Sequence, residues 1–137
     1  MENNSSVIER DDVVIRFSGD SGDGMQLSGT LFSDTSALLG NGVSTFPDYP
    51  SEIRAPQGTV AGVSGFQVHI GNFAVSTPGD YADVLVAMNP AALKANIKWV
   101  RRGGTIICDV DAFNDKGFER AGFATTDVVT ELKIEDF

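Results

Sequence analysis

The sequence predicts an α/β fold with three layers, α/β/α, in which helices cover both faces of a mostly parallel sheet that includes an antiparallel hairpin. A β-rich run at residues 13–17 meets a glycine turn at once, and apolar residues at helical spacing follow. Two nearly continuous apolar runs, residues 83–88 and 105–110, are typical of buried parallel strands. Partial alternation over residues 59–70 instead predicts the antiparallel strand.

The first half of the chain gives the clearest boundaries. After the glycine turn, residues 25–39 predict a helix that ends at Gly40, which suits a left-handed cap. A second strand is expected at residues 43–46. Three prolines then predict a loop at residues 47–58.

The predicted hairpin pairs residues 59–70 with residues 73–76 across Gly71 and Asn72. Glycines inside the longer strand indicate a bulge or a close approach of another backbone. They are Gly62 and Gly65.

The second half predicts a strand, a helix and another central strand. Asn89 suits the N-cap and Pro90 the first turn of a helix that runs to about residue 102, where Gly103 and Gly104 end it. Beyond the strand at residues 105–110 the patterns weaken. A short helix at 114–121 and a strand at 128–134 are expected there.

Length and composition indicate one domain, residues 13–137, behind a polar tail at residues 1–12. The abrupt end of the pattern suggests an excised or C-terminally truncated unit. A formal charge of −9 argues against a nucleic-acid module and against an anionic membrane surface. Neither a signal peptide nor an apolar run of about 20 residues is evident. A single cysteine excludes a cluster held by four thiolates within this chain, and cytoplasm is the expected location.

The glycine loop is the first candidate site. Between a strand and a helix, backbone N–H groups and the helix N-terminus can receive a phosphate, which makes Gly19, Ser21, Gly22 and Gly24 candidate cofactor-binding residues. The spacing fits neither the dinucleotide fingerprint nor a P-loop. Acidic residues within the loop oppose a polyphosphate, so a tight turn without a ligand is the alternative. These are Asp20 and Asp23.

A second candidate lies in the proline-rich stretch at residues 49–58. Arg54 could grip a phosphate or carboxylate with two hydrogen bonds, with Glu52 beside it. The alternative is a surface ion pair of little energetic value. We expect Cys108 to be a small buried hydrophobe and His69 to have a packing role. No catalytic triad is predicted. No metal site is predicted either, because the G-D-G segment at residues 22–24 lacks the later asparagine that a thiamine-diphosphate enzyme uses to bind its metal.

Two longer segments together resemble a known family. They are V-I-R-F-S-G-D-S-G-D-G-M-Q-L-S-G (residues 14–29) and F-P-D-Y-P-S-E-I-R-A-P-Q-G (residues 46–58). Both are similar to the γ-type domain of 2-oxoacid:ferredoxin oxidoreductases, in the version found at the N-terminus of the fused α subunit of 2-oxoglutarate:ferredoxin oxidoreductases (2-oxoglutarate synthases). Residues 63–71, 82–93 and 102–107 fit the same family.

The resemblance implies oxidative decarboxylation of a 2-oxoacid on thiamine diphosphate, with electrons passing through iron–sulfur clusters to ferredoxin and the acyl group leaving on coenzyme A. It places coenzyme A, a co-substrate, near this domain, and thiamine diphosphate, magnesium and the clusters on other domains or subunits. The implied partners are the α domain and the β subunit of a heteromer. The isolated chain is expected to be inactive.

The carry-over to single residues is partial. The family's usual loop is G-x-G-G-Q-G, and in this sequence Gly19, Gly22 and Gly24 take the place of its glycines. The family's E-x-R element corresponds to Glu52 and Arg54. The E-x-R segment could instead face the α domain. Two other functions stay open: a purely structural interaction domain of the same complex, and a small nucleotide-binding module.

Overall fold

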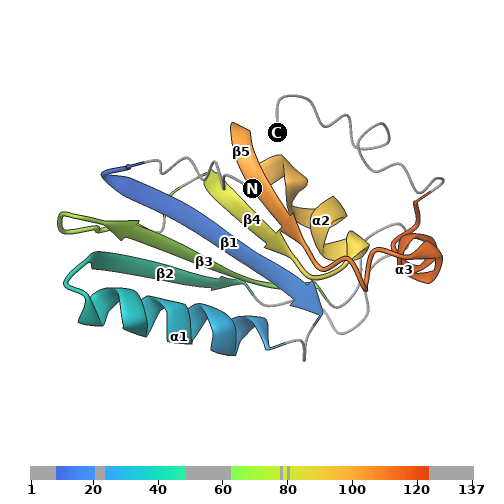
Figure 1. Cartoon of the computed structure of the whole chain (residues 1–137), viewed down its shortest axis with the longest axis horizontal. Helices are drawn as coiled ribbons and strands as arrows, with labels where there is room; N and C mark the ends of the chain where they lie inside the picture. The colour runs from blue at the N-terminus through green and yellow to red at the C-terminus, as the bar shows by residue number, and fades with distance from the viewer. Residues whose placement is uncertain (1–8, 21–23, 49–62, 78, 80, 124–137) are drawn as a thin grey trace, which may run out of the picture.

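The computed structural model describes residues 9–20, 24–48, 63–77, 79 and 81–123. The predictions for Ser21, Gly22, Glu52, Arg54, Gly62 and the strand at residues 128–134 lie outside these ranges. Figure 1 shows the elements in chain order. They are β1 (Asp12–Asp20), α1 (Met25–Leu38), β2 (Gly42–Asp48), β3 (Val63–Gly71), β4 (Ala82–Ala87), α2 (Pro90–Asn96), the 3-10 turn η1 (Ile97–Trp99), β5 (Val100–Cys108) and α3 (Asp115–Arg120).

The described strands form one sheet in the order β2-β3-β1-β4-β5. β3 is antiparallel to both β1 and β2, whereas β4 is parallel to β1 and to β5. Four of these five strands therefore run in one direction and β3 runs against them. The connection from β1 through α1 to β2 is a crossover that leaves room for β3 between its two strands.

Alternation along β1 places α1 and α2 on opposite faces of the sheet. The Phe17 ring packs against Phe32 of α1 at 5.7 Å between ring centroids. The neighbouring Arg16 points the other way and donates from Nε to Asn96 Oδ1 of α2 at 2.6 Å. Successive side chains of a strand point to opposite faces, so the three-layer α/β/α architecture is confirmed (Figure 1).

Small side chains let α1 lie close to the sheet. Its buried positions are Met25, Gly29, Ser33 and Ser36. A Cβ atom at Gly29 would come within 2.2 Å of Phe66 Cδ1, so only glycine fits against this buried ring. Gly40, with φ of 88°, follows the end of the helix as predicted.

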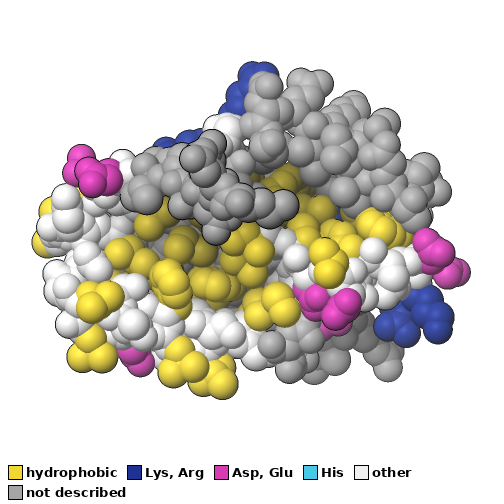
Figure 2. All heavy atoms as spheres, in the orientation of Figure 1, with side chains coloured by type: hydrophobic (Ala, Val, Ile, Leu, Met, Phe, Trp, Pro, Cys, Tyr) yellow, Lys and Arg dark blue, Asp and Glu magenta, His cyan; other side chains and the backbone are white. Residues whose placement is uncertain are grey.

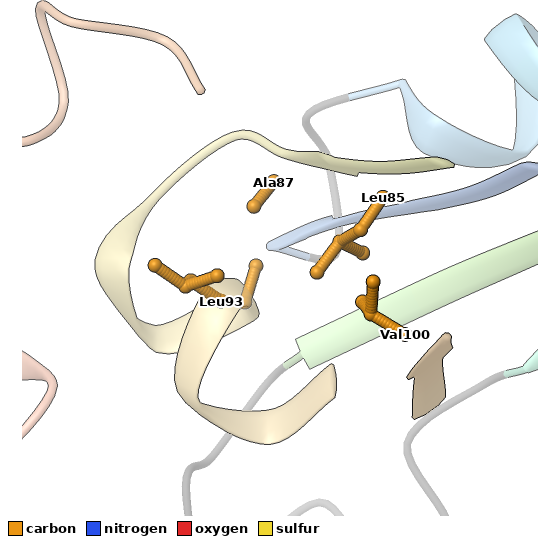
Figure 3. Close-up of a cluster of buried hydrophobic side chains, with 5 residues drawn as sticks. Leu85, Ala87, Leu93 and Val100 are labelled. Atoms are coloured by element: carbon orange, nitrogen blue, oxygen red, sulfur yellow. The ribbon is translucent and has the colours of Figure 1, made fainter. Parts of the chain in front are cut away.

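Among the described residues, the larger of two buried apolar clusters lies between the sheet and α2. Leu85 and Ala87 of β4 meet Leu93 of α2, and Val100 closes the group at the start of β5 (Figure 3). Leu85 and Ala87 are fully buried. This explains the continuous apolar run of β4, which has neighbouring strands on both sides.

A polar network shares this layer. Arg16 is only 6% exposed, and besides Asn96 it reaches Gln67 Oε1 of β3 from Nη1 at 3.1 Å. Asn96 Nδ2 donates to Ser18 Oγ at 2.7 Å, and Gln67 Nε2 donates to the Gly79 carbonyl at 2.6 Å. The network thus joins β1, β3, α2 and the segment before β4. Buried polar groups are tolerated when they find partners of this kind.

Three predictions about the elements were wrong. Residues 73–76 form no strand, and β3 takes β1 and β2 as its antiparallel partners instead. The second helix ends at Asn96, after which η1 leads directly into β5, so the helical stretch does not reach residue 102. Gly103 and Gly104 lie inside β5, where Gly103 has a φ of 75° close to the register shift between β4 and β5.

Other expectations are confirmed in whole or in part. β2 covers the strand predicted at residues 43–46 and extends two residues into the predicted loop, to Asp48. β4 covers the predicted run except Met88, and Asn89 caps α2 with Pro90 in its first turn. β5 covers most of the run at residues 105–110, although it is the last strand of the described sheet rather than a central one. Of the two interpretations of Gly65, the bulge is wrong, because Gly65 keeps regular register with both neighbouring strands. None of the described helices is long and apolar enough to span a bilayer.

Candidate functional site at the carboxyl edge of the sheet

The candidate site lies where β1, β4 and β5 end side by side. These neighbours run parallel, so their carboxyl ends meet at one edge of the sheet (Figure 1). The helix after β1 leads toward β2 on one face, whereas the helix after β4 leads to β5 on the other face. Ligands of open α/β sheets bind at such a switch point, beyond the carboxyl ends of the strands.

The two helices that begin at this edge differ in how their first turns are satisfied. At α2, Asn89 Oδ1 accepts a hydrogen bond from the Ala92 amide at 2.8 Å, so this N-terminus is capped. At α1 the N-cap is Gly24, with φ of 78°, no side-chain cap and no acidic residue in the first turn. The free amides of a first turn carry partial positive charge and attract anions. Of these two helices, α1 is therefore the one whose N-terminus suits a phosphate.

Asp20 is engaged at the same edge. Its Oδ1 accepts a hydrogen bond from Asn89 Nδ2 at 3.1 Å, which ties the end of β1 to the cap of α2. From the sequence, this carboxylate was expected to repel a bound polyphosphate. The sequence did not reveal its hydrogen bond with Asn89. The strand order is needed to bring these residues together, since they lie 69 positions apart.

Replacing Asn89 tests this link. Asn89→Ala is expected to lower the free energy of unfolding by about 1–2 kcal/mol, because the cap and the bond to Asp20 are both lost. Asn89→Asp keeps a capping oxygen but sets two carboxylates side by side. Its deficit relative to wild type at pH 7 should shrink as the salt concentration rises, because salt screens the repulsion between the two carboxylates. Urea denaturation at low and at high salt measures this.

Asn114→Ala is the matched control, because Asn114 Oδ1 caps α3 by accepting from the Gly117 amide at 3.0 Å. It loses a cap of the same kind without touching Asp20. An Asn89→Asp variant as stable as wild type at pH 7 would contradict the Asp20 contact.

Only two of the predicted cofactor-binding residues are described at this edge. Gly19 is buried in β1, where it pairs with Ser64 of β3, and Gly24 caps α1. Their assignment as cofactor-binding residues stays a prediction. Within the described ranges, no three His, Cys, Asp or Glu side chains gather closely enough to hold a metal ion.

Cys108 ends β5 at this edge and is partly buried against the Leu85 cluster. Burial raises the pKa of its thiol. A raised pKa keeps the thiol protonated near neutral pH and makes it a poor nucleophile. Its position fits the predicted packing role.

His69 has partners that the sequence did not reveal, at the opposite, amino edge of β1. Its Nδ1 lies 2.7 Å from the Thr77 carbonyl oxygen, and its Nε2 lies 2.8 Å from Asp12 Oδ2. Both partners are acceptors, so both ring nitrogens donate when the ring is protonated. Burial, the largest single influence, lowers the pKa, but the hydrogen bonds to Asp12 and Thr77 and the charges of Asp12 and Asp83 together raise it above 6.5.

This contact predicts a pH-dependent stability. Because the folded-state pKa exceeds the unfolded value, the stabilisation is fully present below about pH 6.5 and is lost as the pH rises through the folded pKa. His69→Gln should therefore cost about 1–2 kcal/mol at pH 5.5 and less at pH 9. Chemical denaturation of both proteins at the two pH values measures the difference. An equal loss at both would contradict a charged His69.

Comparison with known proteins decides the family. The sequence matches the family described as pyruvate ferredoxin/flavodoxin oxidoreductase over residues 14–133. The chain belongs to this family. The resemblance of the two long sequence segments is thereby confirmed, and the matched residues include all the described elements except the first residues of β1.

Individual proteins are similar to this chain over most of its length. It is 54% identical over 115 residues, 84% of its length, to the 2-oxoglutarate oxidoreductase subunit KorA of Mycobacterium tuberculosis. A 2-oxoglutarate:ferredoxin oxidoreductase from Magnetococcus marinus, solved with 2-oxoglutarate, coenzyme A and succinyl-CoA bound, matches 74% of the chain with a TM-score of 0.63 and 29% identity. The γ subunit of a keto/oxoacid ferredoxin oxidoreductase from Geobacter sulfurreducens matches 73% with a TM-score of 0.57 and 25% identity.

The chain is much shorter than these relatives. It spans 18% of KorA, 17% of the Magnetococcus chain and 52% of the Geobacter γ subunit. The similarity is therefore that of one domain within a longer polypeptide.

Proposed function

We propose that this chain is the γ-type domain of an oxidoreductase that converts 2-oxoglutarate, coenzyme A and oxidised ferredoxin to succinyl-CoA, carbon dioxide and reduced ferredoxin. The observation that carries the proposal is its 54% identity to a subunit of a 2-oxoglutarate oxidoreductase. With one cysteine and one histidine in 137 residues, the chain is poorly equipped to hold an iron–sulfur cluster. We assign the clusters, thiamine diphosphate and magnesium to other domains or subunits of a cytoplasmic complex.

Within that enzyme, the proposed role of this domain is to support coenzyme A access and subunit assembly. Coenzyme A carries a pyrophosphate and a 3′-phosphate, and both need cationic or N–H partners. The uncapped N-terminus of α1 supports an anion site beside Gly19, Ser21, Gly22 and Gly24. Glu52 and Arg54 are the proposed second element of the site, in which Arg54 would meet a phosphate.

A purely structural role within the same complex is the second candidate. It is favoured by the apolar side chains that α1 exposes, with Leu27 at 62%, Leu31 at 57% and Leu38 at 88%. The largest contiguous apolar patch on a monomeric protein is often functional. A domain with only this role would assemble with the α and β parts of the enzyme and leave coenzyme A affinity unchanged when Arg54 is replaced.

A domain exchange tests the proposed reaction. In the KorA of Mycobacterium tuberculosis, the region that matches this chain is replaced by the chain itself, and the hybrid is produced with the other subunits of that enzyme. The hybrid should reduce a viologen dye when both 2-oxoglutarate and coenzyme A are present, whereas the isolated chain should not. An assembled hybrid without this activity would contradict the proposed function.

A further inference from the structure

The helix α1 turns three leucines to its exposed side, which is unusual for a helix that covers a sheet. Its buried positions, apart from Met25, are small or polar: Gly29, Ser33 and Ser36. Leu27, Leu31 and Leu38 are instead the exposed ones. At 100° per residue these three leucines fall within about 40° of one another, opposite the buried side. We call Leu27, Leu31 and Leu38 the leucine stripe.

Figure 2 shows this arrangement as hydrophobic side chains along α1 at the lower edge of the view. Amphipathic helices normally turn such a stripe toward the core. Here the close approach of Gly29 to Phe66 fixes α1 on the sheet by its small-residue side. More than half of each leucine side chain in the stripe therefore stays exposed in this domain, which leaves the stripe available for another surface.

Charge restricts what that partner can be. α1 contains no lysine or arginine and a single acidic residue, Asp34, between Leu31 and Leu38 on the same side of the helix. Two-fold pairing with a second copy would bring Asp34 of one copy near Asp34 of the other, between chains that each carry a formal charge of −9. Like charges at such a distance are unfavourable. A complementary partner is apolar and has a lysine or arginine opposite Asp34.

The small area of the leucine stripe also favours a partner within a larger assembly. Three leucines along one helix expose a few hundred Å², well below the roughly 800 Å² per partner that a free-standing interface buries. Such a strip suits a contact within an assembly that other contacts also hold together. The KorA relative offers that setting, because the unit that matches this chain is only 18% of its length.

We propose that the leucine stripe docks on an apolar surface bearing a basic residue, in the remaining part of the oxidoreductase. The inference rests on the proposed function and adds to it the face through which this domain is held. The hybrid with Mycobacterium tuberculosis KorA, purified with its partner subunits, is the test. We expect Leu27→Ser/Leu31→Ser/Leu38→Ser to lower the yield of assembled complex at least tenfold, measured by size-exclusion chromatography with light scattering.

The matched control is Phe46→Ser/Phe73→Ser/Val110→Ser, which removes apolar side chains outside α1 that are 51%, 52% and 81% exposed. It should assemble like the unmodified hybrid. Asp34→Lys should weaken assembly more than Asp34→Asn, because it sets like charges against each other. The stripe variant of the isolated chain should unfold at the same temperature as wild type within a few degrees, which separates docking from folding.

Three outcomes would contradict the inference. Normal assembly of the stripe variant, or failure of the unmodified hybrid to assemble, would overturn it. So would sedimentation velocity that finds the isolated chain to be a dimer dissociated by the stripe substitutions, because the partner would then be a second copy. An unmodified hybrid that assembles through the stripe but lacks 2-oxoglutarate-dependent activity would refute the proposed function and leave the docking face in place.

Discussion

Arg16→Leu should lower the free energy of unfolding by roughly 2–6 kcal/mol, since each buried acceptor left without a donor costs about 1–3 kcal/mol. The guanidinium donates hydrogen bonds to Asn96 Oδ1 and Gln67 Oε1, and leucine can donate to neither. A small domain is stable by only about 5–15 kcal/mol. Urea denaturation should therefore show either a large fall in the midpoint or a chain that is partly unfolded in buffer.

Two variants separate the network from the mere loss of an arginine. Arg120→Leu changes an exposed arginine of α3 and should leave the midpoint nearly unchanged. Arg16→Lys keeps the charge but lacks the forked donors that reach two acceptors at once, so it should remain clearly destabilised. A midpoint for Arg16→Leu within error of wild type would show that the network contributes little.

Gly29→Val should destabilise the domain by roughly 3 kcal/mol, although valine has a higher helix propensity than glycine. The first added carbon would lie 2.2 Å from Phe66 Cδ1, and Phe66 is a buried ring with little room to move. Either the ring or α1 must shift, and both movements disturb the packing of the helix on β3. Thermal and urea denaturation, followed by circular dichroism, measure the loss.

The neighbouring Ser28→Val is the control, because Ser28 is exposed in the same helix. It should change stability by less than about 0.5 kcal/mol. In a double-mutant cycle, Phe66→Ala should cost less in the Gly29→Val background than alone, since the space it opens receives the valine. Additive losses would mean that the two residues do not meet.

The sequence was informative about the fold where local chemistry decides the structure. The helical spacing of α1, the Asn89 cap of α2 and the apolar run of β4 each predict their element correctly. The glycine turn was predicted to begin at Gly19, but Gly19 and Asp20 lie inside β1, paired with β3. The sequence was misleading where tertiary contacts decide. Residues 97–102 have helix-compatible side chains, yet the chain turns at η1 and pairs with β4. The strand order of the whole sheet decides which strands pair with β3, and the local turn residues carry no information about that order.

The site was predictable only in part for the same reason. Gly19 and Gly24 could be read from a strand, a glycine turn and a helix in succession. The contacts of Asp20 with Asn89, of Arg16 with Asn96 and of His69 with Asp12 join residues more than fifty positions apart. An arginine within an otherwise apolar strand was the one available signal that a buried polar network was present.

The most direct test of the central claim is a calorimetric titration of coenzyme A into the KorA hybrid at low salt. The hybrid is compared with its Arg54→Ala variant, and Arg120→Ala serves as the control arginine. We expect saturable binding by the hybrid and by Arg120→Ala, and an affinity lower by about 10- to 100-fold for Arg54→Ala, because a charged hydrogen bond is lost. An assembled hybrid that binds no coenzyme A, or an Arg54→Ala variant that binds it as tightly as the parent, would contradict a coenzyme A role for this domain.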